Sequence, residues 1–404
     1  MPQMVEDRND KSTVRRNLIV CFDGTNNEFG TENTNVVRLV QVLDRDPFLQ
    51  RVFYDPGVGT LPEPGFVTKV GRKISDILGL AFGAGLSWKV QQAYGYLMDM
   101  WEPGDQVYIF GFSRGSYSAR VLAGLLHTLG LLPRGNDSLV PYLMRIYAGL
   151  TKERQAGANG KGPWQELCDS FRWTFSRAAF AGDEVRRFPV YFLGLWDTVS
   201  SVGWVWDPAK YPYTATNPSV ATIRHAISLD ERRWFFRQNR MYQAAGNVTG
   251  QTKGQDLLEY WFPGVHCDVG GGYPEQDGGL WRPPFGWILA EAETAGLKVD
   301  AARKQTVLNV VQPSPAPWDD PQHGSLQGAW WIAEYFPKQV WISQDKRLEW
   351  QIGGGRSRTV QKGALISKAA LDRIRDIDYR PPNLDPAFIQ KVLNLPSTPD
   401  SLSY

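Results

Sequence analysis

Short apolar runs alternate with helix-like segments along most of the chain. Five runs have the pattern of buried strands: 17–22, 51–54, 105–110, 190–196 and 257–262. A turn containing Gly, Asp, Asn or Pro follows each of them, and three intervening segments have helical spacing: 35–43, 86–101 and 116–132. Near-continuous apolar strands that alternate with helices are typical of a parallel sheet covered on both faces. The pattern therefore predicts an α/β fold with a doubly wound, mostly parallel sheet.

The same pattern predicts one main domain with additions at both ends. The polar stretch 1–16 has the composition of an N-terminal tail, and the alternation of strands and helices occupies residues 17–290. Residues 134–188, which include a Gly-rich loop, and residues 200–255, rich in Trp, Tyr and Pro, are interpreted as insertions. We expect residues 291–404 to form a C-terminal extension packed on the main domain.

The third predicted strand leads into Gly111-Phe112-Ser113-Arg114-Gly115, and a predicted helix follows. Strand, G-x-S-x-G and helix is the order of a nucleophile elbow, a sharp turn that holds the serine hydroxyl clear of the backbone. Glycine is required on both sides because a Cβ there would collide with the neighbouring strand and helix. Ligands of doubly wound sheets bind beyond the carboxyl ends of the strands, where this serine is expected. Ser113 is therefore the candidate nucleophile.

A serine nucleophile needs a base, and the chain contains only four histidines. His127 lies within the helix predicted after Ser113, and His225 lies in a pattern that also predicts a helix, so both are expected to be structural. His266 follows the fifth strand and precedes a glycine-rich turn, which makes it the preferred base. His323, in a predicted loop, is the rival base.

Asp197 directly follows the fourth strand and is the candidate for the acid that orients the base. The chain order Ser113, Asp197, His266 is that of the α/β-hydrolases. In the alternative interpretation, Asp197 caps its own turn with Thr198. Asp268 is the second candidate acid, although its position two residues after His266 also suits a residue that braces its own loop.

A tetrahedral intermediate would require two hydrogen-bond donors for its oxyanion. The backbone N–H of Arg114, the residue after the nucleophile, is the first candidate. The turn at Gly24 and Thr25, after the first strand, is the candidate for the second donor. Asp23 either pins that turn or, together with Asp268, ligates a hard cation.

Composition narrows the classes of function. The chain has 44 basic and 42 acidic residues, for a net charge of +2, without a long run of either sign, so no nucleic-acid partner is expected. Three scattered cysteines predict neither a disulfide framework nor a zinc site. The glycine triplets 270–272 and 353–355 match no phosphate-binding fingerprint and are interpreted as turns. We therefore expect no metal and no cofactor.

The sequence shows no secretory signal and no apolar run of about 18 residues that would span a membrane. We expect synthesis in the cytoplasm, with any export by a route that needs no such signal. Membrane contact is a separate hypothesis, based on the apolar, glycine-containing segment 74–86 and on the Trp-rich insertion. Segment 74–86 also has the composition of a helix buried against the sheet.

Six motifs carry a resemblance to a known family: 22–27, 54–60, 111–115, 192–199, 225–233 and 261–273. In this order they resemble the α/β-hydrolase domain family that includes phospholipase effectors of bacterial type VI secretion. The resemblance implies ester hydrolysis by a triad carried over to Ser113, His266 and Asp197. It also implies a phospholipid or other ester as substrate, and a secretion-apparatus or immunity protein as partner.

Two other functions stay open on sequence alone. The first is a metal-assisted phosphoester hydrolase that uses Asp23, Asp268 and His266. The second is a hydrolase fold without activity that serves as a binding module.

Overall fold

The computed structural model describes residues 15–24, 30, 32–57, 82–155, 162–199, 203–204, 207–208, 211–249, 251–308, 316–328, 330–335, 337–342 and 347–404. In these parts of the chain, no helix is long and apolar enough to cross a membrane. Of the apolar segment 74–86, only residues 82–86 are described, and they begin helix α3 (Phe82–Met100).

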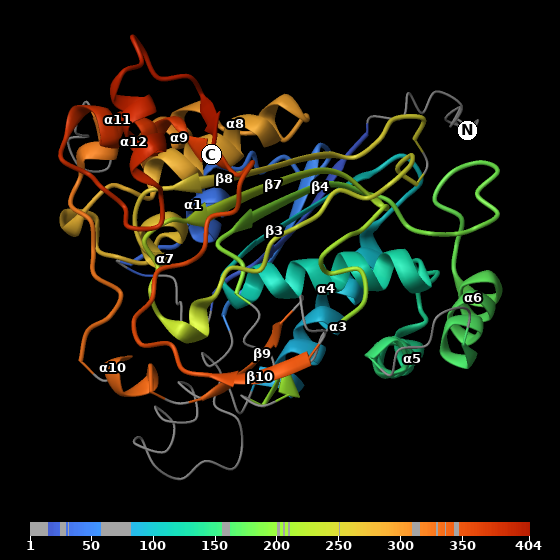
Figure 1. The fold of residues 1–404 in the computed structure, drawn as a ribbon. Helices are drawn as coiled ribbons and strands as arrows, with labels where there is room; N and C mark the ends of the chain where they lie inside the picture. The colour runs from blue at the N-terminus through green and yellow to red at the C-terminus, as the bar shows by residue number, and fades with distance from the viewer. Residues whose placement is uncertain are drawn as a thin grey trace, which may run out of the picture.

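An eight-stranded sheet forms the centre of the molecule, in the order β12-β11-β8-β7-β4-β3-β1-β2 (Figure 1). Its strands are β1 (Asn17–Phe22), β2 (Gln50–Asp55), β3 (Gln106–Phe112), β4 (Val190–Trp196), β7 (Val220–Ser228), β8 (Asp256–Phe262), β11 (Leu365–Ser367) and β12 (Ser401–Ser403). All neighbours pair in parallel except β11 and β12, which are antiparallel. The predicted α/β fold with a mostly parallel sheet is confirmed. The five strands expected from the sequence are β1, β2, β3, β4 and β8.

Strand β7 lies in the middle of the sheet, although the sequence indicated otherwise. Residues 220–228 fall within the predicted insertion 200–255, and His225 was expected in a helix; both expectations are wrong for this strand. The physical reason is that β7 carries buried polar side chains, which interrupt the apolar run. His225 is bonded to Glu259 of the neighbouring strand at 2.8 Å, and this partner makes a buried imidazole acceptable there.

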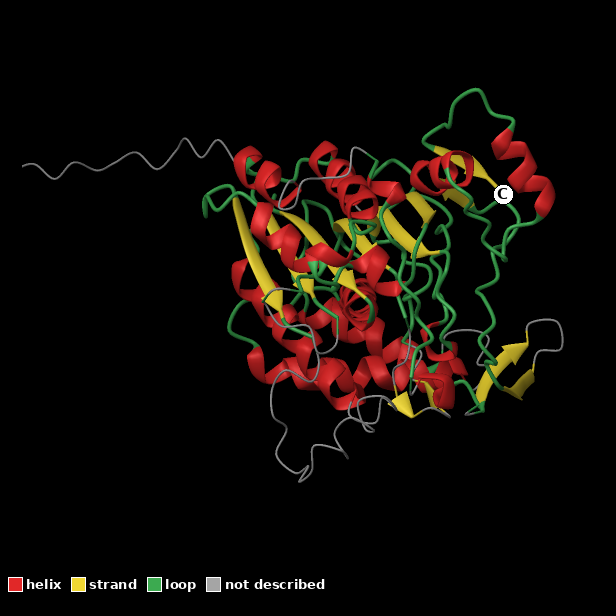
Figure 2. Ribbon diagram, turned by 90° about the vertical axis from the view of Figure 1, so that its left-hand side faces the viewer, coloured by secondary structure: helices red, strands yellow, loops and turns green. Residues whose placement is uncertain are grey.

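Helices cover both faces of the sheet (Figures 1 and 2). One layer contains α3, α4 (Arg114–Leu129), α5 (Val140–Gln155) and α6 (Pro163–Phe175). The other contains α1 (Asn35–Val42), α8 (Arg282–Thr294) and α9 (Ala301–Leu308), while α11 (Lys368–Asp376) and α12 (Pro386–Leu393) form a separate cluster at the β11–β12 end of the sheet. Side chains of β1 alternate between the two layers, because Leu18 and Val20 join the first core and Ile19 joins the second.

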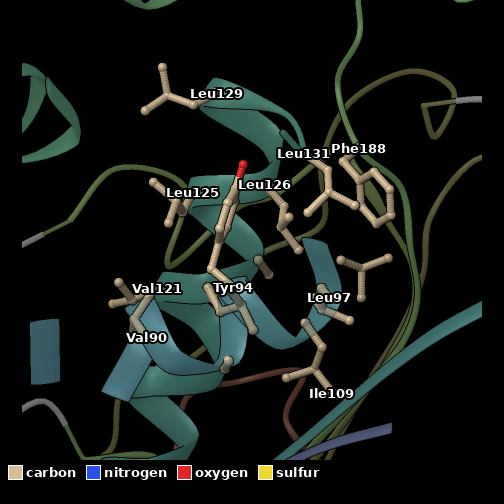
Figure 3. Close-up of a cluster of buried hydrophobic side chains, with 14 of the residues drawn as sticks. Val90, Tyr94, Leu97, Ile109, Val121, Leu125, Leu126, Leu129, Leu131 and Phe188 are labelled. Atoms are coloured by element: carbon tan, nitrogen blue, oxygen red, sulfur yellow. The ribbon is translucent and has the colours of Figure 1, made fainter. Parts of the chain in front are cut away.

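The packing of α3 on α4 fixes the helix that follows Ser113. Val90, Tyr94 and Leu97 of α3 pack with Val121 and Leu125 of α4 in one buried cluster (Figure 3). The hydroxyl of Tyr94 donates to the carbonyl of Gly130 at 3.0 Å, which holds the C-terminal end of α4 as well. The helix that begins at the elbow therefore has a rigid support.

The C-terminal part of the chain completes the sheet. Strand β11 extends it beyond β8, and β12 pairs with β11 at the edge. Helix α8 continues through residue 290, so the domain boundary expected there would divide a helix; the other domain limits stay predictions. Short elements complete the fold: β5 (Gly203–Trp204), β6 (Asp207–Pro208), α7 (His266–Gly270), α10 (Trp330–Ala333), β9 (Lys338–Ile342), β10 (Arg347–Gln351) and the 3-10 helices Asp137–Leu139, Trp234–Phe236, Glu275–Asp277 and Pro317–Asp319.

Candidate active site

Ser113 occupies a sharp turn between β3 and α4. Its backbone has φ 58° and ψ −124°, a conformation that residues with a side chain rarely adopt and that persists only where the surroundings hold it. A Cβ at Gly111 would lie 2.6 Å from the carbonyl oxygen of Gly115, and a Cβ at Gly115 would lie 2.3 Å from that of Phe22. Both contacts are too close for any side chain, so the expected need for glycine on both sides of the serine is confirmed.

The side chains of Ser113, His266 and Asp197 form one chain of hydrogen bonds. Oγ of Ser113 lies 2.7 Å from Nε2 of His266, and Nδ1 of His266 lies 2.5 Å from Oδ2 of Asp197. Ser113 and Asp197 directly follow β3 and β4, and His266 follows β8, so three parallel strands deliver them to one edge of the sheet. When Nδ1–H donates to the carboxylate, Nε2 is left to accept the serine proton. This arrangement is chemically competent for nucleophilic attack by serine.

Asp197 is held rigidly beneath the imidazole. Its backbone N–H donates to the carbonyl of Ala226 at 2.7 Å, and its Oδ1 accepts from the backbone N–H of Ser228 at 2.9 Å. The N–H of Thr198 donates to Nε2 of His225 at 3.2 Å and not to Asp197. These contacts favour the orienting position over the alternative in which Asp197 caps its own turn.

Sequence reasoning missed Arg358, which pairs with Asp197. Nη1 of Arg358 lies 2.5 Å from Oδ1 of Asp197, and Nη2 lies 3.0 Å from Oδ2, with both side chains buried. Burial by itself raises the pKa of Asp197, but the charge of Arg358 and the hydrogen bond from His266 outweigh it and hold the pKa well below its ordinary value. The carboxylate is therefore ionised at neutral pH. Arg358 follows a glycine turn far along the chain, and no local motif marks it.

The environment of His266 keeps its imidazole neutral. Burial lowers the pKa of His266 more than the bond and charge of Asp197 raise it. The rings of Phe112 and Phe236 pack against it, with centroids 4.7 and 4.8 Å from that of the imidazole. Its backbone N–H donates to Oε2 of Glu231 at 3.2 Å, which fixes the start of α7. A neutral, oriented imidazole is what a general base at neutral pH requires.

The second-rank candidates His323 and Asp268 pair with each other. Nδ1 of His323 lies 2.6 Å from Oδ1 of Asp268, and the His323 ring stacks on Tyr273 with centroids 3.6 Å apart. Oδ2 of Asp268 accepts from the backbone N–H of Val265 at 2.9 Å. Asp268 thus braces the start of the short helix α7, which carries His266, and this geometry favours His266 over His323 as the base.

The remaining histidines have structural partners. Nδ1 of His127, inside α4, lies 2.7 Å from Oγ of Ser219, and His225 is bonded to Glu259 in the sheet. Both were expected to be structural, and neither is bonded to Ser113.

The candidate oxyanion donors lie where β1 and β3 end. Arg114 directly follows Ser113 and begins α4. The N–H of Gly24 donates to Oδ1 of Asp23 at 2.6 Å, and Oδ2 of Asp23 accepts from the hydroxyls of Thr34 and Tyr54, each at 2.8 Å. These contacts favour the interpretation that Asp23 pins its turn over the alternative that it ligates a cation. Thr25 lies outside the described residues.

No cluster with metal-ligand character is present in the described parts of the chain. Across them, no group of three or more His, Cys, Asp or Glu side chains could hold a metal ion. Asp23 and Asp268, the candidate cation ligands, are each engaged by the separate partners given above. Their donor sets thus do not converge on one point.

A family model and a known protein each match more than half of this chain. The family model of the Tle1-like phospholipase effector of the type VI secretion system (T6SS), catalytic domain, matches residues 16–291. The uncharacterized protein YEL023C of Saccharomyces cerevisiae is 37% identical over 236 residues, which cover 56% of this chain and 33% of the relative.

Two solved structures are also similar, each at 19% sequence identity. An uncharacterized protein from Pseudomonas aeruginosa matches with a TM-score of 0.38 over 70% of this chain and 46% of that chain. A Tle1 effector bound to the VgrG spike of the type 6 secretion system matches with a TM-score of 0.32 over 64% of this chain and 51% of that chain. The chain thus spans between a third and about half of the length of these relatives.

Proposed function

Because the chain belongs to the family of Tle1-like phospholipase effectors of the type VI secretion system, we propose that it is a serine hydrolase that cleaves carboxylic esters. The observation that carries the proposal is the hydrogen-bond chain from Ser113 through His266 to Asp197, at the carboxyl ends of parallel strands. The substrate class we propose is phospholipid, and its support is family membership alone.

In the proposed reaction, Nε2 of His266 accepts the proton of Ser113 while Oγ attacks the carbonyl carbon of the ester. The tetrahedral intermediate collapses, the carbon–oxygen bond to the alcohol breaks, and His266 gives its proton to the leaving alcohol. The acyl group stays on Ser113 until water, deprotonated by the same imidazole, releases it as a carboxylic acid. Asp197 keeps Nδ1–H in place and stabilises the imidazolium that forms in each half-reaction.

The oxyanion would be bound by backbone donors. We propose the N–H of Arg114 as the first, since it directly follows the nucleophile. Gly24 is the proposed second donor, and for this its N–H must turn away from Asp23, to which it donates without substrate. Hydrogen bonds of this kind tighten in the complex with substrate, so the unbound geometry does not argue against them.

The site supports this reaction better than metal-assisted phosphoester hydrolysis. Asp23, Asp268 and His266, the residues which that alternative needs, are bonded to three different sets of partners. The third function, a binding module without activity, does not account for the backbone strain stored at Ser113.

The test is the variant Ser113→Ala, with Ser118→Ala, one turn along α4, as its matched control. Hydrolysis of p-nitrophenyl butyrate and the release of fatty acid from phosphatidylcholine vesicles are measured. We expect both activities to be lost in Ser113→Ala and kept in the control, with similar melting temperatures. If Ser113→Ala had the activity of the wild type, Ser113 would not be the nucleophile. If a fluorophosphonate failed to label the folded wild-type protein, the result would favour a binding module without activity.

Partners follow from the same family membership. We propose that the chain engages a lipid surface, that a secretion apparatus exports it, and that an immunity protein counteracts it. Retention of the purified chain on phosphatidylglycerol vesicles during sedimentation tests the first of these. Absence of sedimentation with any vesicle composition would contradict it.

A further inference from the structure

Arg358 comes from outside the part of the chain that matches the family model, yet it reaches the centre of the site. The match ends at residue 291, whereas the guanidinium of Arg358 pairs with both carboxylate oxygens of Asp197. We propose that Arg358 is a positioning residue that holds the Asp197 carboxylate against His266, so that the C-terminal segment completes the active site. This inference rests on the proposed function.

The guanidinium joins the groups on either side of His266. Besides Asp197, Nη1 lies 2.7 Å from Oγ of Ser228 and 3.1 Å from its carbonyl oxygen. Nε lies 3.1 Å from the carbonyl oxygen of Phe236, whose ring packs edge-on against His266. The Arg358 side chain therefore contacts both Asp197 and the backbone of Phe236, the two residues that flank the imidazole of His266. The planar fork of arginine suits such two-atom contacts, which lysine cannot reproduce.

The glycine triplet 353–355 delivers Arg358 to this position. Gly354 and Gly355 have φ of 60° and 67°, so the turn needs residues without a side chain. A Cβ at Gly353 would lie 2.1 Å from Oε2 of Glu334 and 2.4 Å from Cβ of Trp234. The triplet thus serves as a turn packed closely on Glu334.

Independent bonds hold that turn against the main domain. Glu334 accepts from the backbone N–H of Trp234 at 2.5 Å and from that of Gly355 at 2.9 Å. Nε of Arg232 donates to the carbonyl of Gly355 at 2.8 Å. Asn383 donates to the carbonyls of Leu229 and Arg358, at 2.8 and 3.1 Å. The segment is therefore fixed just before Arg358 and at the Arg358 backbone itself, as expected for a residue whose position matters.

The buried charge of Arg358, next to Asp197, also affects how readily Asp197 and His266 bind a proton. Protons bind to Asp197 and His266 as a coupled pair, and a positive charge next to the pair disfavours the protonated form. Among the other charged groups of the described residues that act on His266, Arg233 acts in the same direction and Glu231 opposes it. Loss of Arg358 should therefore move the acid limb of the pH profile to higher pH, by about one unit or more.

The experiment compares Arg358→Met and Arg358→Lys with wild type and with the control Arg356→Met, which changes an exposed arginine of the same segment. The value of kcat/KM for p-nitrophenyl butyrate is measured from pH 5 to pH 9, together with melting temperatures. The titration of His266 is followed by NMR in a Ser113→Ala background, which needs no activity. This second readout separates a failure of the present inference from a failure of the proposed function.

We expect kcat/KM to fall at least about tenfold in both Arg358 variants, since small misplacements of a catalytic group cost that much or more. In Arg358→Met, the acid limb of the kcat/KM profile and the midpoint of the NMR titration of His266 should both move to higher pH. The shift should be smaller in Arg358→Lys and absent in Arg356→Met. If Arg358→Met does not fold, Arg358→Lys alone tests the inference, and we expect its kcat/KM to be lower than that of the wild type. An unchanged midpoint in every folded Arg358 variant, or activity within twofold of wild type, would overturn the inference.

Discussion

Oδ2 of Asp197 lies 2.5 Å from Nδ1 of His266, although 69 residues separate the two along the chain. The distance is short because β4 and β8 end at the same edge of the sheet with only β7 between them. A hydrogen bond from Nδ1–H to this carboxylate selects the tautomer in which Nε2, next to the serine, carries no proton. The strand order thus brings together the two side chains whose hydrogen bond sets the tautomer that the proposed mechanism needs.

Replacing Asp197 by Asn should abolish most of the activity. The amide would present a donor as well as an acceptor to His266, and the equivalent change in serine proteases lowers kcat by about 10⁴ because the wrong tautomer is favoured. Steady-state hydrolysis of p-nitrophenyl butyrate measures the effect, and Asp378→Asn, at an exposed carboxylate, is the control. Activity of Asp197→Asn within tenfold of wild type would assign the acid to another residue.

The pH profile of kcat/KM should extend to unusually low pH. The base must be neutral to act, and burial lowers the pKa of His266 below its ordinary value. Activity is therefore lost only as the pH falls through this lowered pKa, below about 6.5, the usual value for histidine. A profile from pH 4.5 to pH 9, with stability checked at each pH, measures the limb. A midpoint above pH 7 would contradict the neutral, buried imidazole.

His323→Ala should change stability and leave most of the activity. The hydrogen bond that His323 donates to Asp268 raises the pKa of His323, so protonated His323 stabilises the folded state. Because the folded pKa exceeds the unfolded value, this contribution is complete below about pH 6.5 and disappears as the pH rises through the folded pKa. The difference in free energy of unfolding between wild type and His323→Ala, from urea titrations, should be larger at pH 5.5 than at pH 9.

The comparison with His266→Ala separates the two histidines. His266→Ala should be as inactive as Ser113→Ala, since members of a triad act as a unit. If His323→Ala were inactive and His266→Ala kept its activity, the assignment of His266 as the base would be wrong.

Gly115→Ala should destabilise the protein and impair the elbow. The added Cβ would lie 2.3 Å from the carbonyl oxygen of Phe22, so α4 or β1 must shift. Overpacking of this kind costs about 1 to 3 kcal/mol of folding free energy. Gly286→Ala is a matched control, because no heavy atom lies within 4 Å of its added Cβ and the position is helical. Thermal unfolding and esterase activity are measured for both. Equal melting temperatures in the two variants would refute the close contact at the elbow.

The local parts of the site could be predicted from sequence, because a strand, a turn and a helix are encoded side by side. Ser113 and Asp197 each directly follow an apolar run, and the end of such a run marks the end of a strand. The candidates for base were few because histidine is rare in this chain. The catalytic role of these residues stays a prediction until the variants are measured.

Long-range contacts could not be predicted in this way. Strand β7 was hidden because Arg224 and His225 break its apolar run, and their partners Glu291 and Glu259 lie on other elements. Arg358 was hidden because its contact with Asp197 spans 161 residues and depends on how the glycine turn folds. A single sequence encodes such pairs only through the complete fold.

The burial of the Arg358–Asp197 pair has a consequence for the effect of salt. Dissolved ions screen charges at the surface over a distance of about 8 to 10 Å near physiological ionic strength, but screen a buried pair much less. Hydrolysis of a small neutral ester should therefore depend little on ionic strength. If hydrolysis depended strongly on ionic strength only with anionic vesicles, the dependence would come from binding of the protein to the lipid surface, because the buried pair in the active site is shielded from dissolved ions.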